Sequence, residues 1–155
     1  MLTLAVCLPG VVGAGEQPLR LSTTDTVTVR ADEAWEMDEG GGIVVEGGVR
    51  INAPRWAVTA DHAELRGALE EPDMVVVDGA PARIRVVLAG GRNTVDGHSD
   101  HIEYARAENI LRLDGAAALD EGGRKIDASA IEYLLSKRIF RTAGDRRVKV
   151  QVIPK

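Results

Sequence analysis

Residues 41–51 have the sequence Gly-Gly-Ile-Val-Val-Glu-Gly-Gly-Val-Arg-Ile. Apolar side chains alternate on both sides of the Glu-Gly step, at Ile43 and Val45 before it and at Val49 and Ile51 after it. Such alternation predicts β-strands with one buried face, because successive side chains of a strand point to opposite sides. Glycine adopts positive φ values freely, so the step predicts a bend. The stretch therefore predicts two strands joined by a glycine bend.

The same pattern occurs twice more, as Val-Val-Val-Asp-Gly in residues 75–79 and as Leu-Arg-Leu-Asp-Gly in residues 111–115. After each bend the alternation resumes, over residues 84–88 and 117–119. The middle copy needs one extra residue to stay in phase, which a β-bulge near Pro81 would supply. Three copies of one strand-turn-strand pattern indicate a repetitive β structure.

A second motif recurs between these copies. Residues 60–65, 99–104 and 128–133 align without gaps, residues 31–36 align more loosely, and the four starts lie 29, 39 and 29 residues apart. Spacings of this size are typical of stacked supersecondary units. We therefore expect an all-β, antiparallel fold of a dozen or more strands, built from about four repeated units.

Turn residues agree with this interpretation. Glycines cluster between the apolar runs, in residues 40–42, 90–91 and 122–123, where a reversal of the chain needs positive φ values. The alternative for residues 61–66 and 131–138 is a short helix.

Composition limits the classes of protein that fit. The chain has 155 residues, enough for one domain, and its 45% hydrophobic content can build a core, which argues against disorder. Its net charge of −5 argues against a nucleic-acid partner. The single cysteine, Cys7, excludes an intramolecular disulfide and a cysteine-rich metal site. No apolar run is long enough to span a bilayer, so an integral membrane protein is not expected.

The amino end differs from the rest of the chain. Residues 1–12 are uncharged and dominated by Leu, Val and Ala, and Val12-Gly13-Ala14 supplies the small residues that precede a signal-peptidase site. We interpret residues 1–14 as a signal peptide and residues 15–155 as a single domain. A buried first strand is the alternative, and a lipoprotein site at Cys7 is a weaker one.

Catalytic motifs are absent from the sequence. No nucleophile elbow, phosphate-binding loop or His-Glu-x-x-His motif occurs. His98 and His101 lie near Asp96 and Asp100, but alternation along a strand does not bring these four side chains together as a compact ligand set. We expect no enzymatic activity, no metal site and no cofactor.

The quoted stretches resemble the LptA/OstA family, the periplasmic bridge proteins of lipopolysaccharide export. The resemblance is carried, in the family's order, by residues 41–51, 58–61, 95–104, 111–117 and 146–154. It implies a folded-over β-jellyroll shaped like a half-open taco, whose inner surface receives the acyl chains of lipid A, the lipid part of lipopolysaccharide. It also implies a periplasmic location, head-to-tail docking between copies, and docking to an LptC-like inner-membrane partner and an LptD-like outer-membrane partner.

Alternating apolar residues are the expected lipid-binding positions. A dry aliphatic groove can hold acyl chains without directional bonds, because each buried methylene contributes ~0.8 kcal/mol. In a closed sandwich the same side chains would only pack against one another. The expected positions are Val27, Val29, Ile43, Val45, Val49, Ile51, Trp56, Val58, Val75, Val77, Ile84, Val86, Ile102, Tyr104, Leu111, Leu113, Ile131 and Tyr133.

Two other functions compete with a bridge that carries lipid. One is an LptC-like periplasmic component of the same pathway. The other is a β-rich structural scaffold whose aliphatic face is filled by its own side chains. Both share the strand pattern, so the sequence alone leaves them open.

Charge is distributed unevenly along the chain. Residues 31–46 contain six acids and no base, whereas residues 137–155 contain seven bases and one acid. If the units stack in order, one end of the molecule is acidic and the other basic. Complementary ends favour head-to-tail contacts, although the same charges are equally expected on solvated edges that resist aggregation.

Overall fold

The computed structural model describes residues 19–20, 26–88, 90–144 and 147–154, so the expected signal peptide lies outside the described residues. These residues form one antiparallel sheet of eleven strands. The strands are β1 (Leu19–Arg20), β2 (Thr26–Arg30), β3 (Glu33–Glu36), β4 (Gly42–Asn52), β5 (Trp56–Arg66), β6 (Met74–Val87), β7 (Thr94–Ala105), β8 (Ile110–Glu121), β9 (Arg124–Leu134), β10 (Ile139–Ala143) and β11 (Lys149–Val152).

The helix alternative is wrong for both segments. Residues 61–66 lie in β5, and residues 131–138 form the end of β9 and the turn that follows. No helix that could cross a bilayer occurs in the part of the chain that the structure describes.

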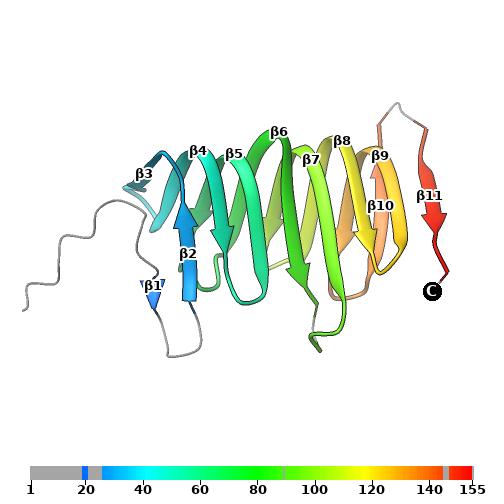
Figure 1. Cartoon of the computed structure of the whole chain (residues 1–155), viewed down its shortest axis with the longest axis horizontal. Helices are drawn as coiled ribbons and strands as arrows, with labels where there is room; N and C mark the ends of the chain where they lie inside the picture. The colour runs from blue at the N-terminus through cyan, green and yellow to red at the C-terminus, as the bar shows by residue number, and fades with distance from the viewer. Residues whose placement is uncertain (1–18, 21–25, 89, 145–146, 155) are drawn as a thin grey trace, which may run out of the picture.

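The sheet is folded over on itself into two layers (Figure 1). Its strands follow the order β1-β2-β4-β5-β6-β7-β8-β9-β10, while β3 pairs with β4 and β11 pairs with β9. Each long strand contributes one half to each layer. In the front layer, one half of each long strand lies between β2 and β11. In the back layer, the other half of each long strand lies between β3 and β10.

The fold line, here called the crease, is made by register shifts. Neighbouring strands lose register between Glu46 and Val49, between Thr59 and His62, and at the corresponding places in β6, β7 and β8. Extra residues bend a strand locally and increase its twist, so aligned irregularities fold the whole sheet. The irregularity expected near Pro81 is confirmed, because β6 shifts between Asp78 and Ala82.

Each strand-turn-strand repeat is one long strand, and the prediction of two separate strands is wrong. At the crease, φ is +81° for Gly47 and +84° for Gly115. A Cβ atom on Gly47 would lie 2.3 Å from Oδ2 of Asp32, and one on Gly115 would lie 2.6 Å from Oδ2 of Asp100. The aspartate of one motif therefore packs against the glycine of the other, which explains why the two motifs occur together.

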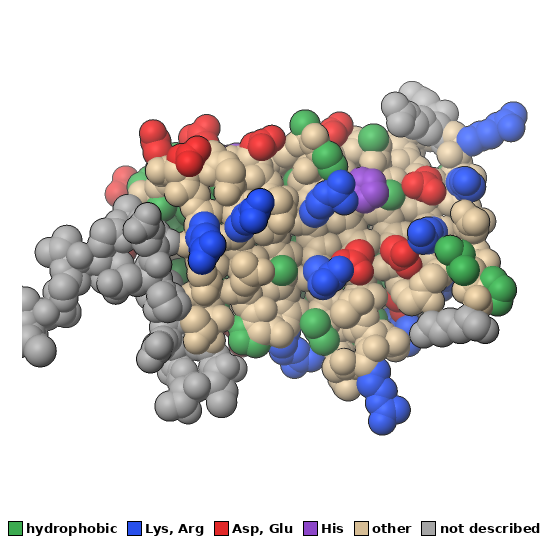
Figure 2. All heavy atoms as spheres, viewed as in Figure 1, with side chains coloured by type: hydrophobic (Ala, Val, Ile, Leu, Met, Phe, Trp, Pro, Cys, Tyr) green, Lys and Arg blue, Asp and Glu red, His purple; other side chains and the backbone are tan. Residues whose placement is uncertain are grey.

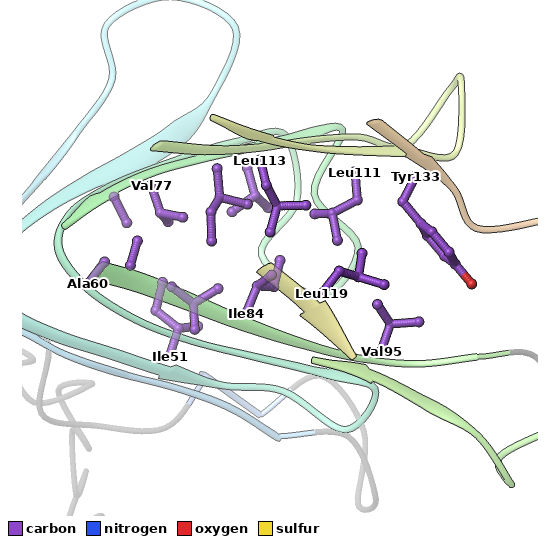
Figure 3. Close-up of a cluster of buried hydrophobic side chains, with 14 of the residues drawn as sticks. Ile51, Ala60, Val77, Ile84, Val95, Leu111, Leu113, Leu119 and Tyr133 are labelled. Carbon is purple, nitrogen blue, oxygen red and sulfur yellow. The ribbon is translucent and has the colours of Figure 1, made fainter. Parts of the chain in front are cut away.

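The core lies between the two layers (Figure 3). Alternation along each strand sends the aliphatic side chains inward and the polar ones outward. On the outer surface, Arg112 is an example: its guanidinium contacts the carboxylates of Glu103, Glu108 and Glu132 at 3.0, 2.9 and 3.3 Å. Glu103 and Glu132, which occupy the same position in two copies of the second motif, are thus solvated surface groups.

Candidate functional site

All the expected lipid-binding positions lie on the inner side of the folded sheet, and most of them are sealed in the core. All but four are at most 7% exposed, and the four exceptions are half-buried residues that pack against the core: Ile43, Trp56, Val86 and Tyr104. Tyr133, Leu111 and Ile51 have no exposed surface. The structure therefore brings the expected side chains together, but only a few of them reach an opening.

That opening lies opposite the crease, between two rows of turns. The front lip consists of the turns at residues 53–55, 90–93 and 122–123, and the back lip consists of those at residues 67–73, 106–109 and 135–138. Between the lips is a cleft of about 780 Å³. Its apolar lining includes Val27, Trp56, Val75, Ile84, Val86 and Tyr104.

Three arginines lie along the rim of this cleft, at positions 55, 106 and 138. Arg106 is held in place by the carboxylate of Asp73, 2.5 Å away, and by that of Glu71 at 3.3 Å. On the apolar side, the buried indole N–H of Trp56 has no hydrogen-bond partner among the described residues. The cleft thus combines an aliphatic floor with a charged rim and one unsatisfied donor.

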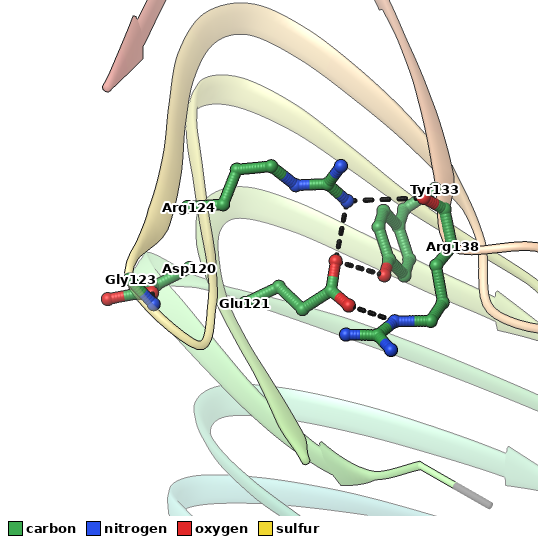
Figure 4. A network of polar contacts seen from close by, with 6 residues as sticks. All are labelled: Asp120, Glu121, Gly123, Arg124, Tyr133 and Arg138. Atoms are coloured by element: carbon green, nitrogen blue, oxygen red, sulfur yellow. Dashed lines mark hydrogen bonds and ion pairs between the residues drawn. The ribbon is translucent and has the colours of Figure 1, made fainter. Parts of the chain in front are cut away.

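The interior changes character at its C-terminal end, where Glu121 is only 5% exposed (Figure 4). Its carboxylate accepts a hydrogen bond of 2.7 Å from the hydroxyl of Tyr133 and one of 2.5 Å from Arg124, and it also accepts one from Nε of Arg138. The guanidinium of Arg124 lies 5.6 Å from the centre of the Phe140 ring. We call Glu121, Arg124, Tyr133 and Arg138 the polar clasp.

Electrostatics keep the clasp charged. Burial alone would raise the pKa of Glu121, but the hydrogen bonds from Tyr133 and Arg138 and the charge of Arg124 outweigh it and lower that pKa. Burial, together with the neighbouring carboxylate, raises the pKa of Tyr133 to about 12. At neutral pH the clasp therefore contains an ionised carboxylate, a neutral phenol and two guanidinium ions.

The clasp was missed by sequence reasoning, although a signal for it exists. Ala117 and Leu119 point inward, and Glu121 is the next residue in the same alternation. Its position in this pattern therefore predicts that its carboxylate lies on the inner side of the strand. The expected interior positions are all aliphatic or aromatic, so they do not include this carboxylate.

The histidines do not form a metal site. His98 lies in the front-layer half of β7 and His101 in the back-layer half, on either side of the register shift. Nδ1 of His101 lies 2.6 Å from the carboxylate of Asp78. Among the residues with a described position, no group of three or more His, Cys, Asp or Glu side chains could hold a metal ion.

A second hollow, of about 590 Å³, lies on the outer side of the front layer, and both charged and aliphatic residues line it. Figure 2 shows this face, where basic and acidic side chains and a histidine gather over the middle strands. The residues that line the hollow include Arg83, Asp96 and His98. Arg85 and Asp96 form an exposed ion pair of 2.6 Å there. Surface pairs of this kind contribute little stability.

The acidic and basic segments lie at opposite ends of the sheet (Figure 1). The acidic end carries β3, where Trp35 is 46% exposed. The opposite edge is formed by β10 and β11, where Ile139 is 57% and Val152 69% exposed. Each end therefore presents an edge strand with an exposed apolar side chain.

Comparison with known proteins gives consistent matches. The family model described as LptA/(LptD N-terminal domain) LPS transport protein matches residues 23–138. The lipopolysaccharide export system proteins LptA of Escherichia coli K12 and of Shigella flexneri are each 24% identical over 152 residues, covering 97% of this chain and 78% of theirs.

A solved structure agrees with the fold. The crystal structure of LptH from Pseudomonas aeruginosa, described as an LptA-homologous periplasmic component of the lipopolysaccharide transport device, superimposes with a TM-score of 0.70. The match has 20% sequence identity and covers 83% of this chain and 95% of that one. The expected antiparallel β-jellyroll is thereby confirmed. The chain is therefore not an enzyme but belongs to the LptA/(LptD N-terminal domain) family of lipopolysaccharide transport proteins.

Proposed function

We propose that this protein is a periplasmic carrier that binds the acyl chains of lipopolysaccharide in the cleft between the lips. The observation that carries the proposal is the opening of about 780 Å³ above an aliphatic floor, within the range of ~300–1,000 Å³ usual for ligand sites. Family membership supplies the ligand class.

Half-buried side chains at the cleft are the expected points of contact. Trp56, Val86 and Tyr104 pack against the core on one side and face the opening on the other. Each methylene that moves from water onto this surface contributes ~0.8 kcal/mol, so a few chains suffice for stable binding. An ester or amide oxygen of the acylated sugar would also satisfy the indole N–H of Trp56 when the lips part.

Photo-crosslinking tests the proposal directly. A benzophenone-bearing amino acid at position 104 should capture lipopolysaccharide, whereas the same group at position 103, on the outer surface, should not. Glu103 is a matched control because it is the immediate neighbour of Tyr104 on the same strand and points away from the core. Equal capture at both positions, or none at either, would contradict the proposal.

A non-binding scaffold is the second candidate, and the sealed part of the core favours it. Thermal unfolding separates the two functions: lipopolysaccharide at 100 times its dissociation constant should stabilise a carrier by ~2.7 kcal/mol and leave a scaffold unchanged. An LptC-like role is separated from a bridge by the amino end. Mass spectrometry of the exported protein should show residues 1–14 removed from a bridge and retained as an anchor in an LptC-like component.

We further propose that the carrier assembles head to tail and docks to LptC-like and LptD-like partners through its two ends. Edge strands with unpaired backbone groups readily add another strand, and the acidic β3 end and basic β10–β11 end are complementary. A contact between unlike surfaces produces filaments and not closed dimers.

Light scattering provides the test of assembly. Apparent mass should rise with protein concentration and fall in high salt, because exposed charges are screened beyond ~8 Å at physiological ionic strength. A mass that stays monomeric at every concentration would rule out self-association.

A further inference from the structure

The two lips present rows of inward side chains that face each other across the cleft. On the front lip, strand pairing aligns Trp56, Val86, Val95, Glu121 and Arg124. On the back lip it aligns Leu65, Val75, Tyr104, Leu111, Tyr133 and Phe140. The front row is thus apolar through β7 and charged in β8 and β9.

The charged part of the front row is tied to the back lip. Glu121 ends the front-layer half of β8, while Tyr133 and Arg138 belong to the back layer and its turn. Its carboxylate contacts both of them, and Arg124 additionally donates a hydrogen bond of 3.1 Å to the backbone carbonyl of Arg138 (Figure 4). These bonds close the space between the lips at β8 and β9. Of the four clasp residues, only Arg138 lines the cleft.

Arg138 has a backbone conformation that arginine rarely adopts. Its φ is +56°, a left-handed value that costs a long side chain more than it costs asparagine or glycine. The equivalent turn one repeat earlier on the same lip has Asn109 at φ +56°, a residue type that tolerates this region. An arginine at such a position is explained by its bond to Glu121.

We propose that the polar clasp ends the lipid-accessible part of the groove at β8 and must open before acyl chains can reach β10. This inference rests on the proposed lipid-binding function and adds a boundary to it. The physical reason is that a hydrocarbon chain cannot replace the hydrogen bonds of a buried carboxylate, so entry past β8 would leave Glu121 and its partners unsatisfied. Lipid therefore stays on the β2–β7 side while the clasp is closed.

Two aromatic positions on the back-lip row provide a matched test. Tyr104 lies on the cleft side of the clasp and Phe140 lies beyond Tyr133, and both are half-buried against the core. A benzophenone-bearing amino acid is placed at 104 or at 140, with position 103 as the outward control. With the clasp intact, lipopolysaccharide capture at 140 should be lower than capture at 104 by a factor of about ten or more.

Opening the clasp should remove that difference. Glu121→Gln keeps the shape of the side chain but loses its charge, and Arg138→Asn removes one partner while suiting the left-handed backbone. Both variants should raise capture at 140 to within about threefold of that at 104, because the clasp loses its charge-assisted bonds. Glu121 does not line the cleft, so Glu121→Gln should leave capture at 104 unchanged, whereas Arg138 lies on the rim and Arg138→Asn is therefore assessed by the ratio of capture at 140 to capture at 104. Circular dichroism checks that each variant is folded, and Arg138→Asn carries the test if Glu121→Gln does not fold.

The outcomes separate the two proposals. Equal capture at 104 and 140 with the clasp intact overturns the clasp inference and leaves the carrier standing, and so does a folded variant with no gain at 140. Loss of capture at every inward position overturns the carrier function itself, and the clasp inference with it.

Discussion

Two parts of one interior differ in how their layers meet. Along β5 to β7 the lips stand apart and leave half-buried apolar side chains around an opening, whereas at β8 to β10 a buried carboxylate joins them. The same strand pattern builds both parts. The difference shows that the strand pattern does not by itself make the groove open or closed, since Glu121 and its partners join the lips in one part only.

The largest expected effect on the free energy of unfolding comes from a substitution in the sealed part of the core. Leu111 has no exposed surface and lies between Tyr104 and Tyr133 on the back-lip row. Leu111→Ala should lower the free energy of unfolding by about 3 kcal/mol, because it leaves a cavity. Urea unfolding measures this, with Ile110→Ala as the outward neighbour. A loss at 111 no larger than at 110 would show that this part is not tightly packed.

Removal of the clasp carboxylate should rank next. Glu121→Ala leaves the Tyr133 hydroxyl and two guanidinium groups without their acceptor, at an expected cost of about 2 kcal/mol. The half-exposed arginines recover part of their hydration, which keeps the cost below that of the cavity. Glu103→Ala is the control, since Arg112 keeps two other carboxylates. Equal losses in urea unfolding would place the clasp among ordinary surface pairs.

Acid should weaken the clasp. The pKa of Glu121 in the folded chain lies below its ordinary value of 4.5, so its contribution to stability is complete above that pH and is lost as pH falls through the lowered value. Unfolding free energies measured from neutral pH into this acidic range should decline less steeply for Glu121→Gln than for the wild-type chain. Parallel declines would mean that Glu121 gains nothing from its partners on folding.

The smallest effect on stability is expected at the cleft. Val86 is half-buried and borders the opening, so Val86→Ala should cost less than about 1 kcal/mol. The same change removes apolar lining, and the stabilisation of the protein by lipopolysaccharide should decrease. A loss of stability as large as that of Leu111→Ala would mean that the cleft is part of the sealed core.

Alternation predicted a large part of the architecture. The apolar residues of 43–51, 75–87 and 111–119 lie in β4, β6 and β8, Leu88 follows directly after β6, and every expected inner position faces inward. The alternation of side chains between two faces is a local property of an extended chain, so it can be recognised in the sequence without knowledge of the fold. The continuity of each strand through its glycine step was not predicted, because it depends on pairing with neighbouring strands on both sides of the step.

The candidate site was predicted only in outline. The sequence indicated which side chains point inward but not that Val45 and Leu111 are sealed while Val86 and Tyr104 border an opening. Exposure depends on how closely the two layers approach, which is a property of the folded sheet. Glu121 and Arg138 are 17 residues apart in the chain, and no spacing rule connects them.

Sequence by itself determined the strands, their inner faces, the glycine steps and the family, because these follow from local alternation and the order of repeated motifs. Only the tertiary structure decided where the interior is open, which inward residues are sealed, and that a carboxylate closes one end. Those features arise where segments distant in the chain meet across the interior, and the distance between two layers is set by all of their contacts together.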